Sequence, residues 1–286
     1  MRIVSLLPAA TEMVAALGAT EWLVGVSHAC DFPPEVLALP RVTRSLIDTT
    51  LPSGRIHEAV AEAARRGGAS VEVDVQRIAQ LRPDVLIGQS VCDVCAVGQQ
   101  DLARVVTALI PVPWVLTLHA HTLDGVLADI GRVGEVLELR DEADELVAGL
   151  RYRLRRVAER GAAEGATRPK PRVVVLEWLD PPYVAGHWVP ELVALAGGAD
   201  VAATPGEPSR VHRWTELIAL DPDVVVVALC GFDVARAQVE LGAVRAGEAR
   251  AVLARRVAVI DGNAYTSRPG PRLVDAAEHL VRALHS

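Results

Sequence analysis

A short motif occurs twice in this chain and constrains its fold more than any other feature. Residues Leu81–Ile87 (LRPDVLI) recur as Leu220–Val226 (LDPDVVV). Each copy has the pattern of an apolar helix end, a Pro-Asp turn and a continuously buried strand, which is typical of parallel strands covered on both faces. The motif therefore predicts two structural units of the same kind.

A second pair of segments supports this interpretation. Arg2–Leu6 (RIVSL) resembles Arg172–Leu176 (RVVVL), and each is followed by a proline-bearing loop and a helix that ends near glycine, at Gly18 and Gly197. Both pairs follow the same order along the chain. We predict an α/β fold with two similar lobes, each built on a parallel sheet, and a ligand cleft between the lobes.

A long helical region separates the two lobes in the sequence. Thr122 can cap a helix from Leu123 to about Leu137, and Asp141 can cap another that runs to about Arg160. A helix of roughly twenty residues spans about 30 Å and would join the lobes as a rigid strut. The predicted division is an N-terminal lobe at 1–121, a connecting helical strut at 122–165 and a C-terminal lobe at 166–286.

Charge and hydropathy exclude two classes of partner. The 286 residues carry a formal net charge of −7, and the most basic run, Arg151–Arg160, reads as the solvated face of a helix. We therefore expect no nucleic-acid partner. No charge-free stretch is long enough to span a bilayer, so we expect no membrane insertion.

The first residues bear on the compartment. The apolar run Ile3–Leu7 is stopped by Pro8, and no small-residue cleavage site follows, as a secretory signal would require. We expect a cytoplasmic protein, unless a leader has been removed. In that compartment the four cysteines are expected to remain thiols or to bind a ligand.

Chemically distinctive residues gather where the predicted strands end. Ligands of parallel sheets lie beyond the carboxyl ends of the strands, where the following loops and helix N-termini converge. Several histidines, three aromatic residues and all four cysteines fall in such segments: His28, His119, His121, His187, Trp178, Trp188, Tyr265, Cys30, Cys92, Cys95 and Cys230.

Each of these residues could also have a purely structural role. A free cysteine is usually a small buried hydrophobe, although the spacing of Cys92 and Cys95 suits a metal or redox site. His119 and His121 could bind a metal from one face of a strand or form a polar cap. Three interpretations stay open for the thiols: binding of zinc, iron or a metal-containing ligand, inert lining of an organic-ligand pocket, and thiol catalysis.

Several stretches resemble the cobalamin-binding solute-binding proteins of ABC importers. The opening Arg2–Glu12 (RIVSLLPAATE) is similar to the start of that family, and so are Gly25–Ser27 with Asp31–Pro34 (GVS, DFPP). The resemblance covers nearly the whole chain and extends to three further segments: Arg77–Asp84 (RIAQLRPD), Pro181–Gly186 (PPYVAG) and Ser267–Leu273 (SRPGPRL).

The resemblance implies a class III periplasmic-binding-protein fold, in which one long helix joins two lobes around a cleft. It also implies docking on a permease through one glutamate per lobe, but those positions hold Gln76 and approximately Ser267, which argues against such docking. The family's ring-covering tryptophan has no counterpart near Thr43–Ser45. An insertion of roughly 25 residues, Leu46–Val71, follows instead. The chain is similar to a leaderless, cytosolic branch of the family.

These observations lead to a first hypothesis, a cytosolic protein that binds cobalamin, another corrinoid or another metal chelate. Trp178, Trp188 and Tyr265 would cover the ring, and the helix N-terminus at Pro8 and Ala9 would hold a phosphate or carboxylate. Glu177 completes the expected ligand-binding residues. The metal would be contacted by a thiol or imidazole from Cys30, Cys92, Cys95, Cys230, His28 or His187.

Two alternatives belong to other classes. The chain could be an enzyme built on a binding-protein fold, with a thiol-bound metal or a thiolate as the reactive group and Glu177 or a histidine as proton carrier. It could also be an ordinary importer component whose leader was removed.

Overall fold

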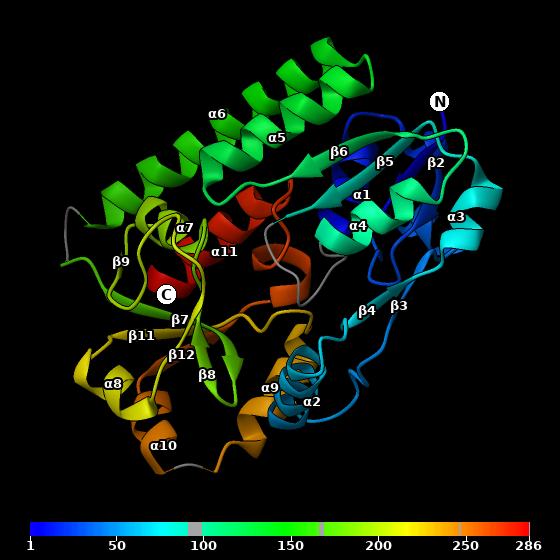
Figure 1. The fold of residues 1–286 in the computed structure, drawn as a ribbon. Coiled ribbons are helices and arrows are strands. Elements are labelled where there is room, and N and C mark those ends of the chain that lie inside the picture. The colour runs from blue at the N-terminus through cyan, green and yellow to red at the C-terminus, as the bar shows by residue number, and fades with distance from the viewer. Residues whose placement is uncertain (91–98, 166–168, 246, 286) are drawn as a thin grey trace. The chain divides into compact units, whose positions relative to one another are not determined.

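The computed structural model describes residues 1–90, 99–165, 169–245 and 247–285, and these fold into two compact units, whose chain path is traced in Figure 1. Unit 1 comprises Met1–Leu51, Arg55–Ala120 and Asp124–Ala148, and unit 2 comprises Pro52–Gly54, His121–Leu123 and Gly149–Ser286. The division at residues 122 and 165 that the sequence suggests stays a prediction.

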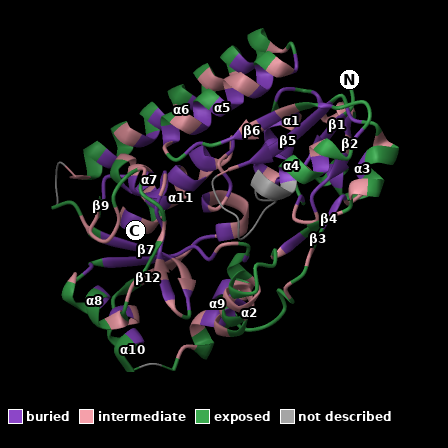
Figure 2. Ribbon diagram, in the orientation of Figure 1, coloured by how far each residue is buried: buried purple, intermediate pink, exposed green. Residues whose placement is uncertain are grey.

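Unit 1 is built on a four-stranded parallel sheet in the order β2-β1-β5-β6. Its strands are β1 (Ile3–Ser5), β2 (Leu23–Val26), β5 (Val85–Gln89) and β6 (Trp114–Leu118). Every residue of β1 and β5 is buried (Figure 2). This is the pattern expected when both faces of a parallel sheet are covered.

Unit 1 also contains elements outside this sheet. A separate antiparallel pair joins β3 (Thr43–Ser45) to β4 (Val71–Val73). The helical elements are α1 (Pro8–Ala16), η1 (Thr20–Trp22), η2 (Pro34–Ala38), α2 (Ser53–Arg65), α3 (Val75–Leu81), α4 (Gln99–Thr107) and α5 (Leu123–Val136). The first two residues of α2 belong to unit 2.

Unit 2 is built on a mixed sheet in the order β10-β8-β7-β11-β12, with β9 also paired to β7. Its strands are β7 (Arg172–Leu179), β8 (Pro182–Val184), β9 (Ala199–Asp200), β10 (Arg210–Val211), β11 (Val224–Val227) and β12 (Arg256–Val259). Strands β7, β9, β11 and β12 are parallel, as predicted, while β8 and β10 run antiparallel. Only Asp180 and Pro181 separate β7 from β8, which is enough for a hairpin but too short for a parallel crossover.

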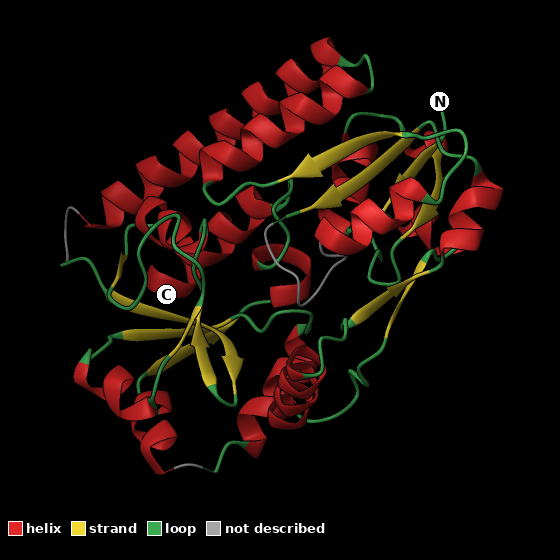
Figure 3. Ribbon diagram, viewed as in Figure 1, coloured by secondary structure: helices red, strands yellow, loops and turns green. Residues whose placement is uncertain are grey.

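The helices of unit 2 are α7 (Val189–Leu195), α8 (Trp214–Ala219), α9 (Val234–Ala243), α10 (Gly247–Leu253), the π-helical turn η3 (Gly262–Thr266) and α11 (Leu273–His285). The long helix α6 (Arg140–Gly165) has 26 residues, of which the last seventeen belong to unit 2. Figure 3 colours it red with the other helices. Its length is about 39 Å. Ala143, Leu150, Leu154 and Val157 are buried along one stripe, as the helical spacing predicts.

Among the described residues, no helix combines the length and the apolar composition needed to cross a membrane.

The repeated motifs meet in the same way in each unit. In unit 1, Asp84 accepts a hydrogen bond from the Arg2 backbone N–H at 2.7 Å, and in unit 2 Asp223 accepts one from the Arg172 N–H at 2.8 Å. Each motif thus ties the start of its own first strand, β1 or β7, to the start of the neighbouring strand, β5 or β11. The prediction of two units of the same α/β kind is confirmed.

Candidate functional site

A buried polar cluster lies beyond the carboxyl end of β1 in unit 1. The Thr11 hydroxyl, on α1, donates to the Ser5 hydroxyl at 2.9 Å and lies 3.1 Å from the Cys30 sulfur. All three residues are at most 1% exposed. The Cys30 thiol therefore sits in a closed network of hydroxyl groups in the interior of its unit.

His28 lies at the border of this cluster and is only partly buried. The Thr43 hydroxyl donates to the Ser27 hydroxyl at 3.1 Å and accepts from the His28 backbone N–H at 2.9 Å. The same oxygen lies 2.8 Å from Nδ1 of His28. When Thr43 gives its hydroxyl proton to Ser27, its oxygen accepts from the ring and Nδ1 is the donor, so the roles in this contact follow the tautomer of His28.

In the neutral tautomer that is protonated at Nδ1, Nε2 of His28 carries the lone pair. Among the described residues, no hydrogen bond reaches that Nε2. Burial, and then the nearby Arg41 guanidinium, lower the pKa of His28. The ring is therefore neutral at pH 7, with a nitrogen that can coordinate a metal.

Pro8 and Ala9 form the first turn of α1, as the sequence predicts. Pro8 is the first helical residue, Leu7 provides no side-chain cap, and Ala9 is 1% exposed. The proposed role of this turn in holding a phosphate or carboxylate stays a prediction.

In unit 2, Trp178 contacts the beginning of the insertion. Its indole N–H donates to the Ser53 carbonyl at 3.2 Å, and its ring lies 5.2 Å from that of Phe232. The Ser53 N–H donates to the buried Glu240 carboxylate, which also pairs with Arg236 at 2.9 Å. A short segment of the insertion is thereby fixed to the residue that was predicted to cover a ligand ring.

The other predicted residues of unit 2 lie in different surroundings. Trp188 is 5% exposed and donates to the Thr266 carbonyl at 2.9 Å, so little of its ring is available to a ligand. Tyr265 packs at 4.7 Å against the ring of His279. Glu177, near the end of β7, and Cys230, just after β11, are partly exposed, and the Cys230 N–H donates to the Glu177 carbonyl at 2.9 Å.

One pair of residues was not foreseen from the sequence. Nδ1 of His121 lies 3.3 Å from Nδ1 of His187, and both residues belong to unit 2. His119 does not share this site, because its Nδ1 contacts Arg132 at 3.0 Å in unit 1. Burial, and then the neighbouring His121, lower the pKa of His187. The spacing of His119 and His121 in the sequence suggests that these two side chains act together, whereas the structure pairs His121 with His187.

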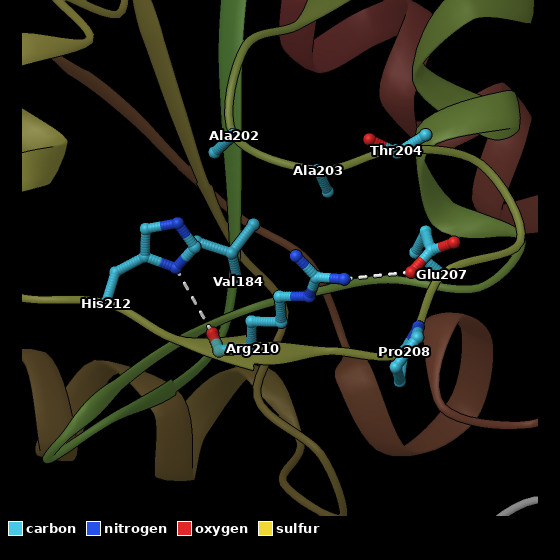
Figure 4. A pocket seen from close by; sticks show the side chains of 8 residues that line it. All are labelled: Val184, Ala202, Ala203, Thr204, Glu207, Pro208, Arg210 and His212. Atoms are coloured by element: carbon cyan, nitrogen blue, oxygen red, sulfur yellow. Dashed lines mark hydrogen bonds and ion pairs between the residues drawn. The ribbon is translucent and has the colours of Figure 1, made fainter.

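A small hollow in unit 2 is lined by residues that the sequence did not single out (Figure 4). Arg210 pairs with Glu207 at 2.8 Å on its rim, and the His212 ring lies beside Val184. The hollow measures about 40 Å³. This volume accommodates a few water molecules, whereas pockets for larger ligands measure about 300–1,000 Å³.

The predicted cysteine ligands do not form a metal centre in the described part of the chain. Cys30 belongs to unit 1 and Cys230 to unit 2, and neither joins a group of three or more His, Cys, Asp or Glu side chains there. Cys92 and Cys95 lie outside the described residues, so their predicted role as metal ligands stays a prediction.

Curated relatives match the chain along nearly its whole length. A vitamin B12-binding protein of Vibrio cholerae is 24% identical over 293 residues, which cover 99% of this chain and 88% of the relative. An uncharacterized ABC transporter substrate-binding lipoprotein, YvrC of Bacillus subtilis, is also 24% identical and covers 99% of this chain and 80% of its own length.

Solved structures agree with the fold. A periplasmic heme binding protein from Pseudomonas aeruginosa is 25% identical with a TM-score of 0.76, covering 99% of this chain and 92% of that one. The periplasmic vitamin B12 binding protein of Vibrio cholerae has a TM-score of 0.70 at 21% identity, covering 99% of this chain and 96% of that one. The profile of one family, described as periplasmic binding protein, matches residues 3–263. The chain belongs to the periplasmic binding protein family, in the class III group whose relatives bind vitamin B12 or heme.

Proposed function

We propose that this protein binds a corrinoid or another macrocyclic metal chelate as its small-molecule ligand. The proposal is supported by the names of the relatives, which include both vitamin B12-binding and heme-binding proteins. Corrinoids and hemes share a flat macrocycle with a metal ion that accepts an axial nitrogen donor. A neutral imidazole at the surface of the ligand site would supply such a donor.

His28 is the single observation that carries the proposal. Its Nδ1 lies 2.8 Å from the Thr43 hydroxyl, burial lowers its pKa, and its Nε2 has no hydrogen-bond partner among the described residues. Metal-binding histidines have this arrangement, because a hydrogen bond on one ring nitrogen orients the other toward the metal. We assign axial coordination of the ligand's metal to Nε2 of His28.

Absorbance titration of the purified protein with aquocobalamin, and separately with hemin, tests the proposal. At micromolar protein, we expect saturable binding of at least one of the two, with a band shift that reports replacement of metal-bound water by imidazole. His28→Ala should abolish the shift and weaken binding by at least about tenfold, the equivalent of 1.4 kcal/mol.

His57→Ala is the matched control, because it removes a partly buried imidazole from α2 in the same unit. It should leave both the shift and the affinity unchanged. Two results would contradict the proposal: no spectral change with either chelate, or an unchanged titration in His28→Ala.

The finer expectations belong to the same proposal. If Trp178 contacts the macrocycle, binding should quench its fluorescence. If Tyr265 contacts the macrocycle, binding should change the absorbance of that tyrosine.

Zinc or iron at the cysteines is tested by metal analysis of wild type and Cys92→Ser. Residence in the cytoplasm, and the absence of permease docking that Gln76 and Ser267 suggest, are tested by cell fractionation and by co-purification with membranes.

A further inference from the structure

The two histidines His121 and His187 face each other although they lie 66 positions apart in the sequence. Their Nδ1 atoms lie 3.3 Å apart, their ring centroids 5.2 Å apart, and the ring planes are inclined by 44°. His121 follows β6 and precedes α5, and His187 precedes α7. A distance of 3.3 Å is long for a hydrogen bond between two nitrogens.

The same distance suits two ligands of one metal ion. A tetrahedral Zn²⁺ ion binds histidine nitrogens at about 2.0–2.1 Å, which separates two such nitrogens by about 3.3–3.4 Å. We propose that His121 and His187 form a two-histidine site for a divalent transition-metal cation such as Zn²⁺ or Ni²⁺. The site is independent of the proposed chelate ligand.

His187 is held in place through its backbone. Its N–H donates to the Glu207 carbonyl at 2.6 Å, and its carbonyl accepts from the Gly206 N–H at 2.9 Å. Its φ of +54° lies in the left-handed region, which costs a residue with a β-carbon on the order of 1 kcal/mol. The protein thus maintains an unfavourable backbone conformation at the residue that presents its ring to His121.

The backbone just after His121 is held by the helix that follows His187. The backbone N–H of Leu123, two residues after His121, donates to the Glu191 carboxylate at 2.7 Å. Glu191 lies in the first turn of α7, whose N-terminus is preceded by His187 and Trp188. The His187 ring also stacks on Trp188 with a centroid distance of 5.5 Å. Helix α7 and the residues just before it thus contact the backbone near His121 and the ring of His187.

The site is open to solvent and to further ligands. His121 is exposed, so water can reach the site. Among the described residues, no third His, Cys, Asp or Glu completes the site. Water or a donor of a second molecule would fill the remaining positions, and imidazole suits zinc and nickel.

Isothermal titration calorimetry with Ni²⁺, on protein whose thiols are blocked with iodoacetamide, tests the site. We expect one equivalent of metal in the wild type that is lost, or weakened by at least about tenfold, in His121→Ala and in His187→Ala. His119→Ala is the matched control, since it removes an exposed histidine two positions away that does not belong to the pair. That variant should bind Ni²⁺ as the wild type does.

A measurement on the wild type keeps the test valid if a variant fails to fold. With Zn²⁺, the ¹⁵N imidazole signals of two of the eight histidines should shift together. Unchanged signals, or a wild-type titration without binding, would overturn the proposal. So would unchanged Ni²⁺ affinity in both folded single variants.

Discussion

At the scale of single residues, the best example of burial changing chemistry is Asp200. Burial raises its pKa to about 6, although its Oδ1 accepts from the N–H groups of Ala202 and Ala203 at 2.9 Å. Among the described residues its Oδ2 is buried without a hydrogen-bond partner. Between pH 3.8 and about 6, the folded protein therefore holds a proton on Asp200 that the unfolded chain, with its ordinary pKa of 3.8, has already released.

This difference predicts a pH dependence. The contribution of Asp200 to stability is fully present below pH 3.8 and is lost as the pH rises through 6, by on the order of 3 kcal/mol. Urea unfolding between pH 4 and 7 should show that the free energy of unfolding falls with pH in the wild type relative to Asp200→Asn, whose amide does not titrate. Asp141→Asn, at an exposed position on α6, should leave the slope unchanged. A constant difference between wild type and Asp200→Asn would refute the prediction.

Residue-scale features explain why the candidate site was only partly predictable. Strand-end position identified His28 and Cys30, because ligand sites of parallel sheets occur there. The contact of His28 with Thr43, fifteen residues away, and the pairing of His121 with His187 depend, however, on packing between distant parts of the sequence. Trp188 was predicted to face a ligand because of its residue type, whereas its burial follows from contacts that sequence spacing does not encode.

At the scale of elements, helix α6 passes very close to the end of α7. A β-carbon on Gly161 would lie 2.5 Å from the Leu195 carbonyl oxygen, and one on Gly197 would lie 2.5 Å from the Gly161 oxygen. Gly197 also has a φ of +86°, which suits glycine at a helix C-terminus. Backbone meets backbone at this crossing, so neighbouring atoms cannot move aside as a flexible side chain would.

We therefore predict that Gly161→Ala destabilises the protein by about 1–3 kcal/mol. Gly149→Ala, in the same helix, meets open space and should be neutral or should stabilise by about 0.5–1 kcal/mol. Thermal and urea unfolding of the two variants measures the difference. Equal effects of the two substitutions would show that the close approach does not limit the packing of α6.

Element type was the most predictable feature. Helices α5 and α6 lie within a few residues of their predicted positions, since their apolar stripes are local signals. Asp141, the predicted cap of α6, lies inside that helix, which begins at Arg140. The antiparallel strand β8 was missed, because Pro181 and Pro182 read as a loop and the pairing of Trp178 with Tyr183 is not visible in either segment alone. The insertion contains α2, and the contact of Ser53 with Trp178 was likewise beyond local patterns.

At the scale of the whole molecule, the internal repeat was the strongest guide to the fold. Arg82 and Asp221, at equivalent places in the two motifs, both adopt positive φ, 45° and 44°. Helices α1 and α7 both end at a left-handed glycine, Gly18 or Gly197. The two similar pairs of segments thus adopt the same local backbone geometry in each unit. A single motif would not have indicated that the units are of the same kind.

The repeat also predicts which strands unfold locally when one of its aspartates is removed. Asp84→Ala removes the acceptor of the Arg2 N–H and should weaken the start of β1 and β5 by about 1 kcal/mol, and Asp223→Ala should do the same for β7 and β11. Because each contact lies within one unit, hydrogen exchange measured by mass spectrometry should increase only in the strands of the substituted unit. Faster exchange in both sheets after either substitution would mean that the two units open as one cooperative body. Faster exchange in one sheet alone would mean that each repeat stabilises its own unit.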